Sequence, residues 1–513
     1  MFSIEYVYRF LEYSFLFYFV FYNSISFCFI FLSFYDVRRR VISRGFEDLD
    51  IVMMSPFTPP ISLIVPAYNE ESTIVESVNS MLNLKFPRVE LVIVNDGSND
   101  TTLDVLKATF NLKRVDINYV ETITTAPILG YYESRQDLPE HVLRFVLVDK
   151  ENGGKADALN AGINASLCPY FLSIDADSVI DELALLQAFR TLLNNERIVA
   201  IGGQIAILNG SVIKRGKVVQ PKLPNCWLIR FQIVEYLRSF TLGRTALSRL
   251  NSIFIISGVF GIFQKDFVKK IGGYLTKGLT SRIALEYTNS KAETVCEDME
   301  IIVRMQRYIH DKKLNKRIAY LPHPFCWTEA PENLNSLSKQ RNRWQRGFLE
   351  TMVYHRKMLF NRDYGRIGLL TFPYFLFFEL LGGPIEFFGY VTLPFLFIFH
   401  SLNYSYLLMF ILVSIIYGIL ISVSSIVVGA WPAKTAEADA STRSLIYFRN
   451  TREIILLLAF AVLENFGYRQ LALWWRMKGT IDFIRGKKRW NKFQRIGFGE
   501  KLQNLGDHKV ATN

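Results

Sequence analysis

Apolar residues gather at the two ends of this 513-residue chain, and this segregation limits its fold more than any other feature. Residues Leu11 to Phe34 form an aromatic-rich stretch long enough to cross a bilayer, with Arg38-Arg39-Arg40 behind it. The stretch lacks the basic start and the small-residue cleavage site of a secretory signal. Because Lys and Arg collect on the cytoplasmic side of a span, we expect a retained anchor that places the next domain in the cytoplasm.

Three more apolar blocks follow in the last third of the chain: Ile367 to His400, Tyr404 to Ala430 and Ile454 to Trp475. Gly382-Gly383-Pro384 interrupts the first block, which is therefore either an interfacial helix with a span or a helical hairpin. Since a basic tail after the last block requires an even number of crossings, the positive-inside rule favours the hairpin. The blocks predict a multi-pass protein of the inner or plasma membrane, in contact with the lipid bilayer.

The charge of the chain fits this membrane arrangement. Its formal net charge is +12, and basic runs such as Lys487-Lys488-Arg489 lie beside apolar stretches. The sequence contains no recognisable nucleic-acid-binding module, so we expect no nucleic-acid partner. Five scattered cysteines without a Cys-x-x-Cys pair suit a reduced cytosolic domain without zinc.

In the last apolar block, Glu464 and Asn465 either face a polar conduit or form a helix-packing hydrogen bond.

The middle of the chain alternates short apolar runs with polar helical stretches. From about Pro56 to about Phe360, this alternation predicts an α/β domain with a mostly parallel sheet and helices on both faces. The expected strands are Ile61–Val65, Leu91–Val94, Phe145–Val148 and Tyr170–Ile174, and the expected helices are Ser72–Leu82, Lys155–Ala165 and Asp181–Leu193. We therefore expect an N-terminal anchor with its basic flank (1–50), a cytoplasmic domain (51–360), transmembrane and interfacial helices (361–480) and a basic cytoplasmic tail (481–513).

Carboxylates follow two of the expected strands. Asp96 comes directly after one of them, and Asp175 and Asp177 come after another. In parallel sheets, ligands sit beyond the carboxyl ends of the strands. Asp175 and Asp177 are suited to hold Mg²⁺ or Mn²⁺ through oxygen ligands, although carboxylates in this position also cap helices. Asp96 precedes Gly97 and could equally form an Asx turn.

Three further motifs carry charged or aromatic residues on expected helices. Gly153-Gly154-Lys155 allows close approach of an anion to a helix start, or is a glycine-rich turn with a solvated lysine. Glu297-Asp298 begins an amphipathic helix, where it is either a general-base motif or a helix cap. Gln340, Arg343 and Trp344 share one helical face, so an amide, a guanidinium and an indole ring can meet at one point. The alternative is an amphipathic helix whose Trp344 packs in a hydrophobic core.

In this order, from about Pro59 to Gly347, the motifs resemble those of processive family-2 glycosyltransferases, such as bacterial poly-β-1,6-N-acetylglucosamine, hyaluronan and cellulose synthases. The first part of the resemblance rests on Val65-Pro66-Ala67-Tyr68-Asn69-Glu70-Glu71 and on Val94-Asn95-Asp96-Gly97-Ser98. Cys296 stands where the family carries threonine, with the acidic pair behind it intact. The resemblance implies a GT-A-like nucleotide-sugar-binding domain embedded between α-helical transmembrane segments.

The resemblance also implies roles for individual residues. Asp298 would be the general base, Asp96 would accept the N3 proton of uracil, and Trp344 would form a floor for the acceptor sugar. The donor would be bound by Pro66, Tyr68, Glu70, Asp96, Lys155, Asp175, Gln340 and Arg343, the acceptor by Trp344, Glu297, Ser257 and Gly258, and Mg²⁺ or Mn²⁺ by Asp175 and Asp177.

The sequence therefore predicts a membrane-bound inverting glycosyltransferase. It would transfer a sugar from UDP-GlcNAc or UDP-glucose to a growing β-linked polysaccharide, processively and coupled to export. The alternatives are a non-processive glycolipid synthase and an inactive membrane scaffold for glycan export. Beyond the donor, the glycan acceptor and the bilayer, a regulatory or export subunit would be a partner. The segments Asn111 to Leu143 and Asn209 to Leu223 differ from the poly-N-acetylglucosamine synthase type and leave the sugar open.

Overall fold

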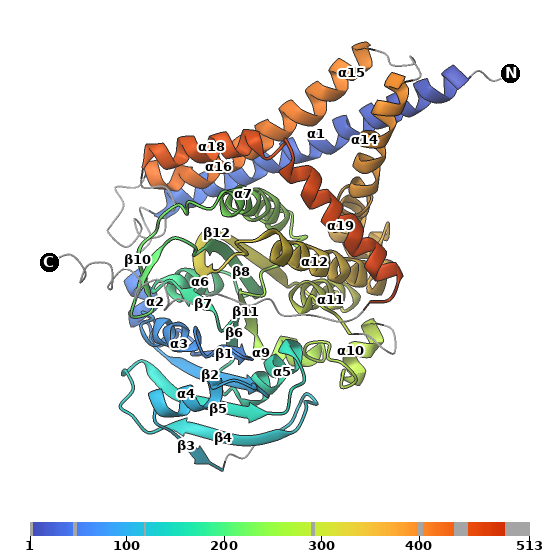
Figure 1. The fold of residues 1–513 in the computed structure, drawn as a ribbon. Helices are drawn as coiled ribbons and strands as arrows, with labels where there is room; N and C mark the ends of the chain where they lie inside the picture. Colours follow the sequence, from blue (N-terminus) through green and yellow to red (C-terminus); the bar gives the residue numbers. More distant parts are fainter. Residues whose placement is uncertain are drawn as a thin grey trace.

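The structure, a computed structural model, describes residues 4–44, 49–116, 120–288, 293–398, 404–435 and 450–487. Figure 1 shows an α/β part below a group of long apolar helices, among them α1 (Ile4–Arg44), α14 (Gly382–Ile398) and α16 (Tyr417–Thr435). The apolar helices therefore come from both ends of the chain. The expected basic tail lies outside the described residues from position 488 onward.

One sheet forms the centre of the α/β part, and it has ten strands within the described residues, in the order β3-β4-β5-β2-β1-β6-β11-β8-β12-β7. The strands β5, β2, β1 and β6 pair in parallel, as do β8 and β12, whereas β11 runs antiparallel between β6 and β8. The bounds are β1 (Ile61–Ala67), β2 (Val89–Asp96), β3 (Leu112–Val115), β4 (Ile128–Ser134), β5 (Val142–Lys150), β6 (Tyr170–Ile174), β7 (Ser178–Ile180), β8 (Ile198–Ile207), β11 (Phe260–Gln264) and β12 (Arg317–Thr328). A separate antiparallel ribbon joins β9 (Val212–Lys214) and β10 (Lys217–Gln220).

Runs of Val, Ile and Leu explain why the central strands form where they do. The strands β1, β2 and β8 are buried along nearly their whole length, as expected for strands covered on both faces. The helix α5 (Lys155–Ala165) approaches β1 so closely that a Cβ at Gly162 would stand 2.2 Å from Ile64 Cγ2. The predicted strands correspond to β1, β2, β5 and β6, which confirms the predicted fold class.

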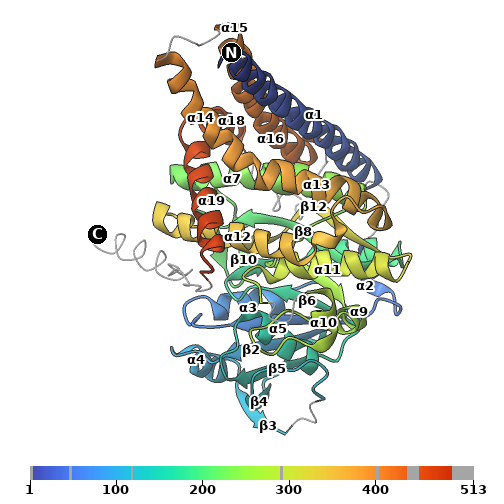
Figure 2. The ribbon, with the colours of Figure 1, turned by 90° about the vertical axis from the view of Figure 1, so that its right-hand side faces the viewer.

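The helices of the α/β part also include the predicted α3 and α6. Figure 2 shows α11 and α12 between the apolar helices and the part of the sheet that includes β6 and β2. The bounds are α2 (Leu49–Met54), α3 (Ile74–Leu82), α4 (Thr102–Thr109), α6 (Ala184–Leu193), α7 (Trp227–Tyr236), the π-helix η1 (Leu237–Arg244), α8 (Thr245–Arg249), α9 (Lys265–Lys270), α10 (Arg282–Tyr287), α11 (Glu297–Asp311) and α12 (Leu334–Tyr354).

Three helical segments among the described residues are long and apolar enough to cross a membrane: Glu12–Arg39, Ile367–Gly389 and Leu407–Ala430. A fourth is possible if α18 (Thr451–Leu463) and α19 (Tyr468–Ile484), which meet at 59°, form one span. The remaining C-terminal helices are η2 (Arg356–Met358), η3 (Arg362–Tyr364), η4 (Ile367–Thr371), α13 (Phe372–Tyr374), η5 (Phe375–Leu380), α15 (Tyr404–Ile411) and η6 (Leu412–Ile416).

The hairpin expected at Gly382-Gly383-Pro384 is wrong, because one helical segment runs through these residues. The Ile385 amide donates a hydrogen bond to the Leu381 carbonyl at 3.0 Å, which continues the helix across the junction. Pro384 lies in the first turn of α14, where a missing backbone N–H costs little.

Glu464 and Asn465, at the end of α18, form packing contacts. Glu464 is fully buried, and its carboxylate accepts hydrogen bonds from the Arg238 guanidinium and the Ser422 hydroxyl. The Asn465 amide donates to the Ala461 carbonyl at 2.9 Å. Of the two interpretations of this pair, the packing hydrogen bond is therefore the one that the structure favours.

Candidate active site

A cavity of about 1480 Å³ lies beyond the carboxyl ends of β1, β2 and β6. It continues between the apolar helices, where Tyr18, Tyr22 and Phe378 line it. Of the predicted site residues, Asp177 is not among those that line this cavity. The ones that do are Pro66, Tyr68, Glu70, Asp96, Lys155, Asp175, Ser257, Gly258, Glu297, Asp298, Gln340, Arg343 and Trp344.

Asp96, at the end of β2, holds the glycine-rich loop in place. Its Oδ1 accepts hydrogen bonds from Lys150 Nζ at 2.7 Å and from the Gly153 amide at 2.9 Å. Its Oδ2 accepts from the Gly154 amide at 2.8 Å. A carboxylate offers about four acceptor positions, so these contacts leave room for one more hydrogen bond on Oδ2. The structure thus adds a loop-positioning contact to the expected uracil contact.

Lys155 begins α5 and bridges two carboxylates in the cavity. Its Nζ lies 2.6 Å from Asp175 Oδ1 and 2.9 Å from Glu297 Oε1. Burial alone would lower the pKa of this amine, but the two carboxylates raise it above its ordinary value. Lys155 is therefore a fixed cation at the centre of an acidic cluster, and about a quarter of its side chain, 27%, remains exposed to a ligand.

Asp298 lies in the first turn of α11 and faces the loop between α8 and β11. Its Oδ2 accepts a hydrogen bond from the Gly258 amide at 2.9 Å. A Cβ at Gly258 would stand 3.2 Å from both Asp298 Oδ2 and Lys155 Nζ, so the loop approaches the carboxylate closely. Burial raises the pKa of the Asp298 carboxyl, Glu297 adds to the rise, and Lys155 opposes it. A carboxylate with a raised pKa is a stronger base.

Asp175 and Asp177, the predicted metal ligands, differ in their exposure. Asp177 lies in the turn between β6 and β7 and is fully buried, whereas 21% of the Asp175 side chain is exposed. Among the residues that the structure describes, no group of three His, Cys, Asp or Glu side chains is placed to hold a metal ion. The residues do fit a nucleotide-borne Mg²⁺, which needs only one or two carboxylates besides the phosphates. Asp175, which lines the cavity, and Asp177 stay the predicted ligands.

The helix α12 presents Gln340, Arg343 and Trp344 to the cavity, as predicted. Sequence reasoning missed Arg341, whose guanidinium carbon lies 4.3 Å from the centre of the Trp344 ring and whose Nη2 lies 2.8 Å from Glu235 Oε2. The Arg341 guanidinium therefore packs against the Trp344 indole and is itself paired with the Glu235 carboxylate. The i,i+3 spacing could have shown the contact between Arg341 and Trp344. The Glu235 partner could not be foreseen, because it is far away in the sequence.

Cys296 joins the start of α11 to α12. It is buried, and its Sγ lies 3.9 Å from the Arg343 carbonyl oxygen, within reach of a weak S–H hydrogen bond. A Cβ at Gly347 would stand 2.4 Å from Cys296 Sγ, so the two helices touch here without room for a larger side chain. This contact sets the distance between Asp298 on α11 and Trp344 on α12.

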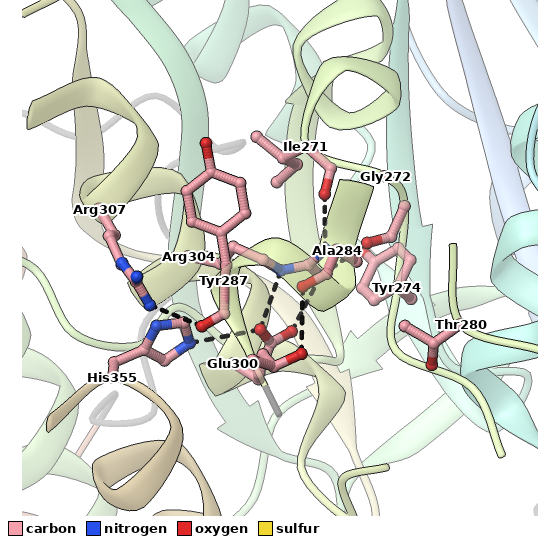
Figure 3. Close-up of polar contacts among 12 residues, drawn as sticks. Ile271, Gly272, Tyr274, Thr280, Ala284, Tyr287, Glu300, Arg304, Arg307 and His355 are labelled. Carbon is pink, nitrogen blue, oxygen red and sulfur yellow. Dashed lines mark hydrogen bonds and ion pairs between the residues drawn. The ribbon is translucent and has the colours of Figure 1, made fainter. Parts of the chain in front are cut away.

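A buried ion-pair cluster fixes the rest of α11. Figure 3 shows Arg304 and His355 pointing toward the Glu300 carboxylate. Arg304 Nε and Nη2 each lie 2.9 Å from a Glu300 oxygen, and its other hydrogen bonds go to the carbonyls of Ile271 and Gly273. Although burial alone would raise the pKa of Glu300, Arg304 and His355 hold it below its ordinary value. The cluster ties α11 to the end of α12 and to the loop after α9.

Two family models match the chain. "Glycosyl transferase family 2" matches residues 62–124, and "Glycosyl transferase family group 2" matches residues 170–424. The chain is a family-2 glycosyltransferase. The resemblance seen in the motifs is thereby confirmed, and the two matches include the segments that carry Asp96, Asp175, Asp298 and Trp344.

This glycosyltransferase is also similar to curated proteins. It is 28% identical to the poly-β-1,6-N-acetyl-D-glucosamine synthase of Staphylococcus epidermidis over 293 residues, 57% of this chain and 55% of that protein. It is 26% identical to the synthase of the same name from Staphylococcus aureus (strain COL), over 57% of this chain and 55% of that one. The aligned part thus spans about half the length of these relatives. Among solved structures, a mannosyltransferase of Pyrobaculum calidifontis in complex with GDP-Man and Mn²⁺ aligns at 15% identity with a TM-score of 0.47, over 93% of this chain and 100% of that chain.

Proposed function

We propose that this glycosyltransferase is a membrane-bound inverting enzyme that extends a β-linked polysaccharide from UDP-GlcNAc or UDP-glucose. The observation that carries the proposal is the convergence of Asp298, Lys155 and Trp344 on one cavity. The similarity to two poly-β-1,6-N-acetyl-D-glucosamine synthases supports a polysaccharide product.

In this proposal, transfer needs a base for the acceptor hydroxyl and a cation for the departing diphosphate. Asp298 is half-buried and lines the cavity, and it takes the proton from the acceptor hydroxyl as that oxygen attacks the anomeric carbon. Attack on the face opposite UDP inverts the centre, so an α-linked donor gives a β-linked product. The ring of Trp344 is the platform on which the acceptor sugar stacks.

The donor lies at the start of α5 in this proposal. Gly154 and Lys155 form a helix N-terminus, which favours an anion, and Lys155 exchanges Asp175 and Glu297 for phosphate oxygens when the donor binds. Arg343 adds a second cation from α12, whose planar fork suits phosphate. Asp175 and Asp177 would hold a divalent cation bound with the donor, and this cation would neutralise charge on the leaving UDP.

The proposal also assigns the parts of the chain. The anchor (1–50) and the helices of 361–480 cross the inner or plasma membrane, and the catalytic domain (51–360) and the tail (481–513) lie on the cytoplasmic side. The continuation of the cavity between α1, η5 and α19 supports processive synthesis coupled to export, since Tyr18, Tyr22 and Phe378 can stack on sugar faces along it. A separate export or regulatory subunit would bind at the membrane part.

The experiment uses the full chain, purified into lipid vesicles with Mg²⁺ or Mn²⁺. Radiolabelled UDP-GlcNAc and UDP-glucose are supplied separately and together, and the product is sized after glycosidase digestion, with Asp298→Asn as the inactive control. High-mass product from one donor supports the synthase and identifies its sugar. Label confined to a lipid-extractable single-sugar product indicates a glycolipid synthase, and absence of both transfer and UDP release indicates a scaffold.

A further inference from the structure

Arg244 is a cavity-lining arginine without a carboxylate partner in the described residues. It ends the π-helix η1, and such helices often occur at functional sites. Its Nε and Nη1 atoms are buried and make no hydrogen bond within the described part of the chain. Its guanidinium carbon lies 3.8 Å from the centre of the Phe240 ring, which covers one face of the cation.

Other arginines of the same cavity differ in this respect. Arg238 contacts the Glu464 carboxylate, Arg341 lies 2.8 Å from Glu235, and Arg476 lies 3.0 Å from Glu379. Each of these cations is neutralised by a carboxylate of the chain itself. The charge of Arg244 is not neutralised in this way, although Arg244 stands less than two turns from Arg238 on the same helix.

A guanidinium in this position needs a partner. Arginine stays protonated in proteins, and removing its charge from water is costly unless an anion or hydrogen-bond acceptors replace the water. Burial lowers the pKa of Arg244, although Tyr320, Asp298 and Tyr236 oppose the shift. Because Arg244 lines the cavity, an anion can reach its guanidinium from there.

The surroundings of η1 indicate whether the donor or the acceptor carries the anionic partner of Arg244. The helix contacts β8 and β12 of the sheet as well as the apolar helices α1 and α16, and the Arg244 side chain lies near Asp298 and Tyr320. Its charge influences the pKa of Asp298, but the two side chains form no ion pair. The donor diphosphate has other cations available, Lys155 and Arg343, on other walls. The group that meets Arg244 therefore belongs to the acceptor.

We propose that Arg244 binds an anionic group of the acceptor, a sugar carboxylate or a phosphate, next to the hydroxyl that Asp298 deprotonates. Either anion accepts charge-assisted hydrogen bonds from a guanidinium. The inference rests on the proposed function, because it takes Asp298 as the base that marks the acceptor. It adds the chemical class of the acceptor to that function: an acidic sugar or a lipid-linked phosphate.

The test compares acceptors that differ only in charge. UDP release by the full chain in lipid vesicles is measured with cellobiose and with cellobiouronic acid, and separately with undecaprenol and undecaprenyl phosphate. We expect the KM of the charged member of one pair to be roughly tenfold lower or more, as charge-assisted hydrogen bonds typically give. The first pair identifies a carboxylate, and the second a phosphate.

Variants then assign the preference to Arg244. Arg244→Gln should raise the KM of the charged acceptor much more than the KM of the neutral one, and Arg244→Lys should restore part of the preference. Arg197→Gln, which removes an exposed arginine on the α/β part, is the matched control and should keep the preference. Equal use of charged and neutral acceptors by the unmodified chain, or an equal effect of Arg244→Gln on both, overturns the inference.

A failure of the proposed function gives a different result. If neither donor yields UDP release with any acceptor, the transferase proposal fails. Calorimetry can still test the Arg244 site, because it needs no turnover. Cellobiouronic acid and undecaprenyl phosphate are titrated separately into the unmodified chain and into Arg244→Gln. Binding that disappears in the variant supports an anion site, and binding that is absent or unchanged overturns it.

Discussion

The Lys155 ammonium lies 2.6 Å from Asp175 Oδ1, and the same nitrogen lies 2.9 Å from Glu297 Oε1. The end of β6 and the starts of α5 and α11 therefore meet at the Lys155 ammonium. With these contacts, the chain neutralises its own carboxylates inside the cavity. A donor diphosphate that recruits Lys155 has to release both carboxylates, so donor binding and the charge state of the acidic cluster are coupled.

Replacing Lys155 with Met should weaken donor binding. The proposed contact is a charge-assisted hydrogen bond, and losing it typically costs about 1.5–3 kcal/mol, or roughly 10- to 100-fold in affinity. Calorimetric titration of UDP into the full chain measures the effect. Lys113→Met, at an exposed lysine of β3, is the control and should bind UDP normally. Unchanged UDP affinity in Lys155→Met would remove Lys155 from the donor site.

The sequence predicted the strands and most of the cavity residues because both depend on local patterns. Buried, mostly apolar strands end at Asp96 and directly before Asp175, and parallel strands bring these ends to one edge. The direction of a side chain in a turn is not a local pattern, so the burial of Asp177 could not be foreseen. The same holds for Asp96, whose carboxylate is bound by a loop more than 50 residues away in the sequence.

The contacts that position α11 and α12 were also beyond sequence reasoning. Arg304 reaches carbonyls about 30 residues earlier in the chain, and His355 comes from the far end of α12. Arg244 gave no signal because its importance lies in a missing partner, and only three-dimensional packing shows which carboxylates stay out of reach.

Replacing Asp298 with Asn should abolish transfer while the fold persists. The amide oxygen of Asn can still accept the hydrogen bond from the Gly258 amide, but the side chain can no longer take a proton. We expect kcat to fall by about 10²- to 10⁴-fold, the usual range for a lost general base. Thermal unfolding and UDP affinity serve as checks that the site is intact. Asp104→Asn, at an exposed aspartate of α4, should keep full activity.

The pH dependence of kcat should show the raised pKa of Asp298. A general base works only when deprotonated, so kcat should rise with pH through this pKa, above the range of an ordinary aspartate. Arg244 is one of the cations that oppose the rise, so Arg244→Gln should move the acid limb to higher pH. Arg244→Lys should move it back. An acid limb unaffected by Arg244→Gln would mean that the limb belongs to another group.

Arg304→Met should destabilise the protein strongly. Both Arg304 and Glu300 are fully buried, and removing one partner of a buried ion pair costs about 3–5 kcal/mol because the other charge is left uncompensated. Chemical denaturation of the full chain in detergent measures the loss. The double variant Glu300→Gln with Arg304→Met should recover part of it. By contrast, Glu133→Gln breaks a solvent-exposed pair with Arg135 and should cost less than about 1 kcal/mol.

Trp344→Ala should separate acceptor binding from donor chemistry. The ring is the proposed platform for the acceptor sugar, and its loss also leaves Arg341 without the aromatic face that it covers. We expect the KM of the acceptor to rise roughly tenfold, the scale of a lost stacking contact, while slow hydrolysis of the donor persists. Trp344→Phe keeps a smaller ring and should recover part of the affinity. Trp227→Ala, at a half-exposed tryptophan outside the cavity lining, provides the comparison for loss of an indole alone. If donor hydrolysis falls with transfer in Trp344→Ala, the ring positions the donor, and the acceptor platform must be sought on another wall of the cavity.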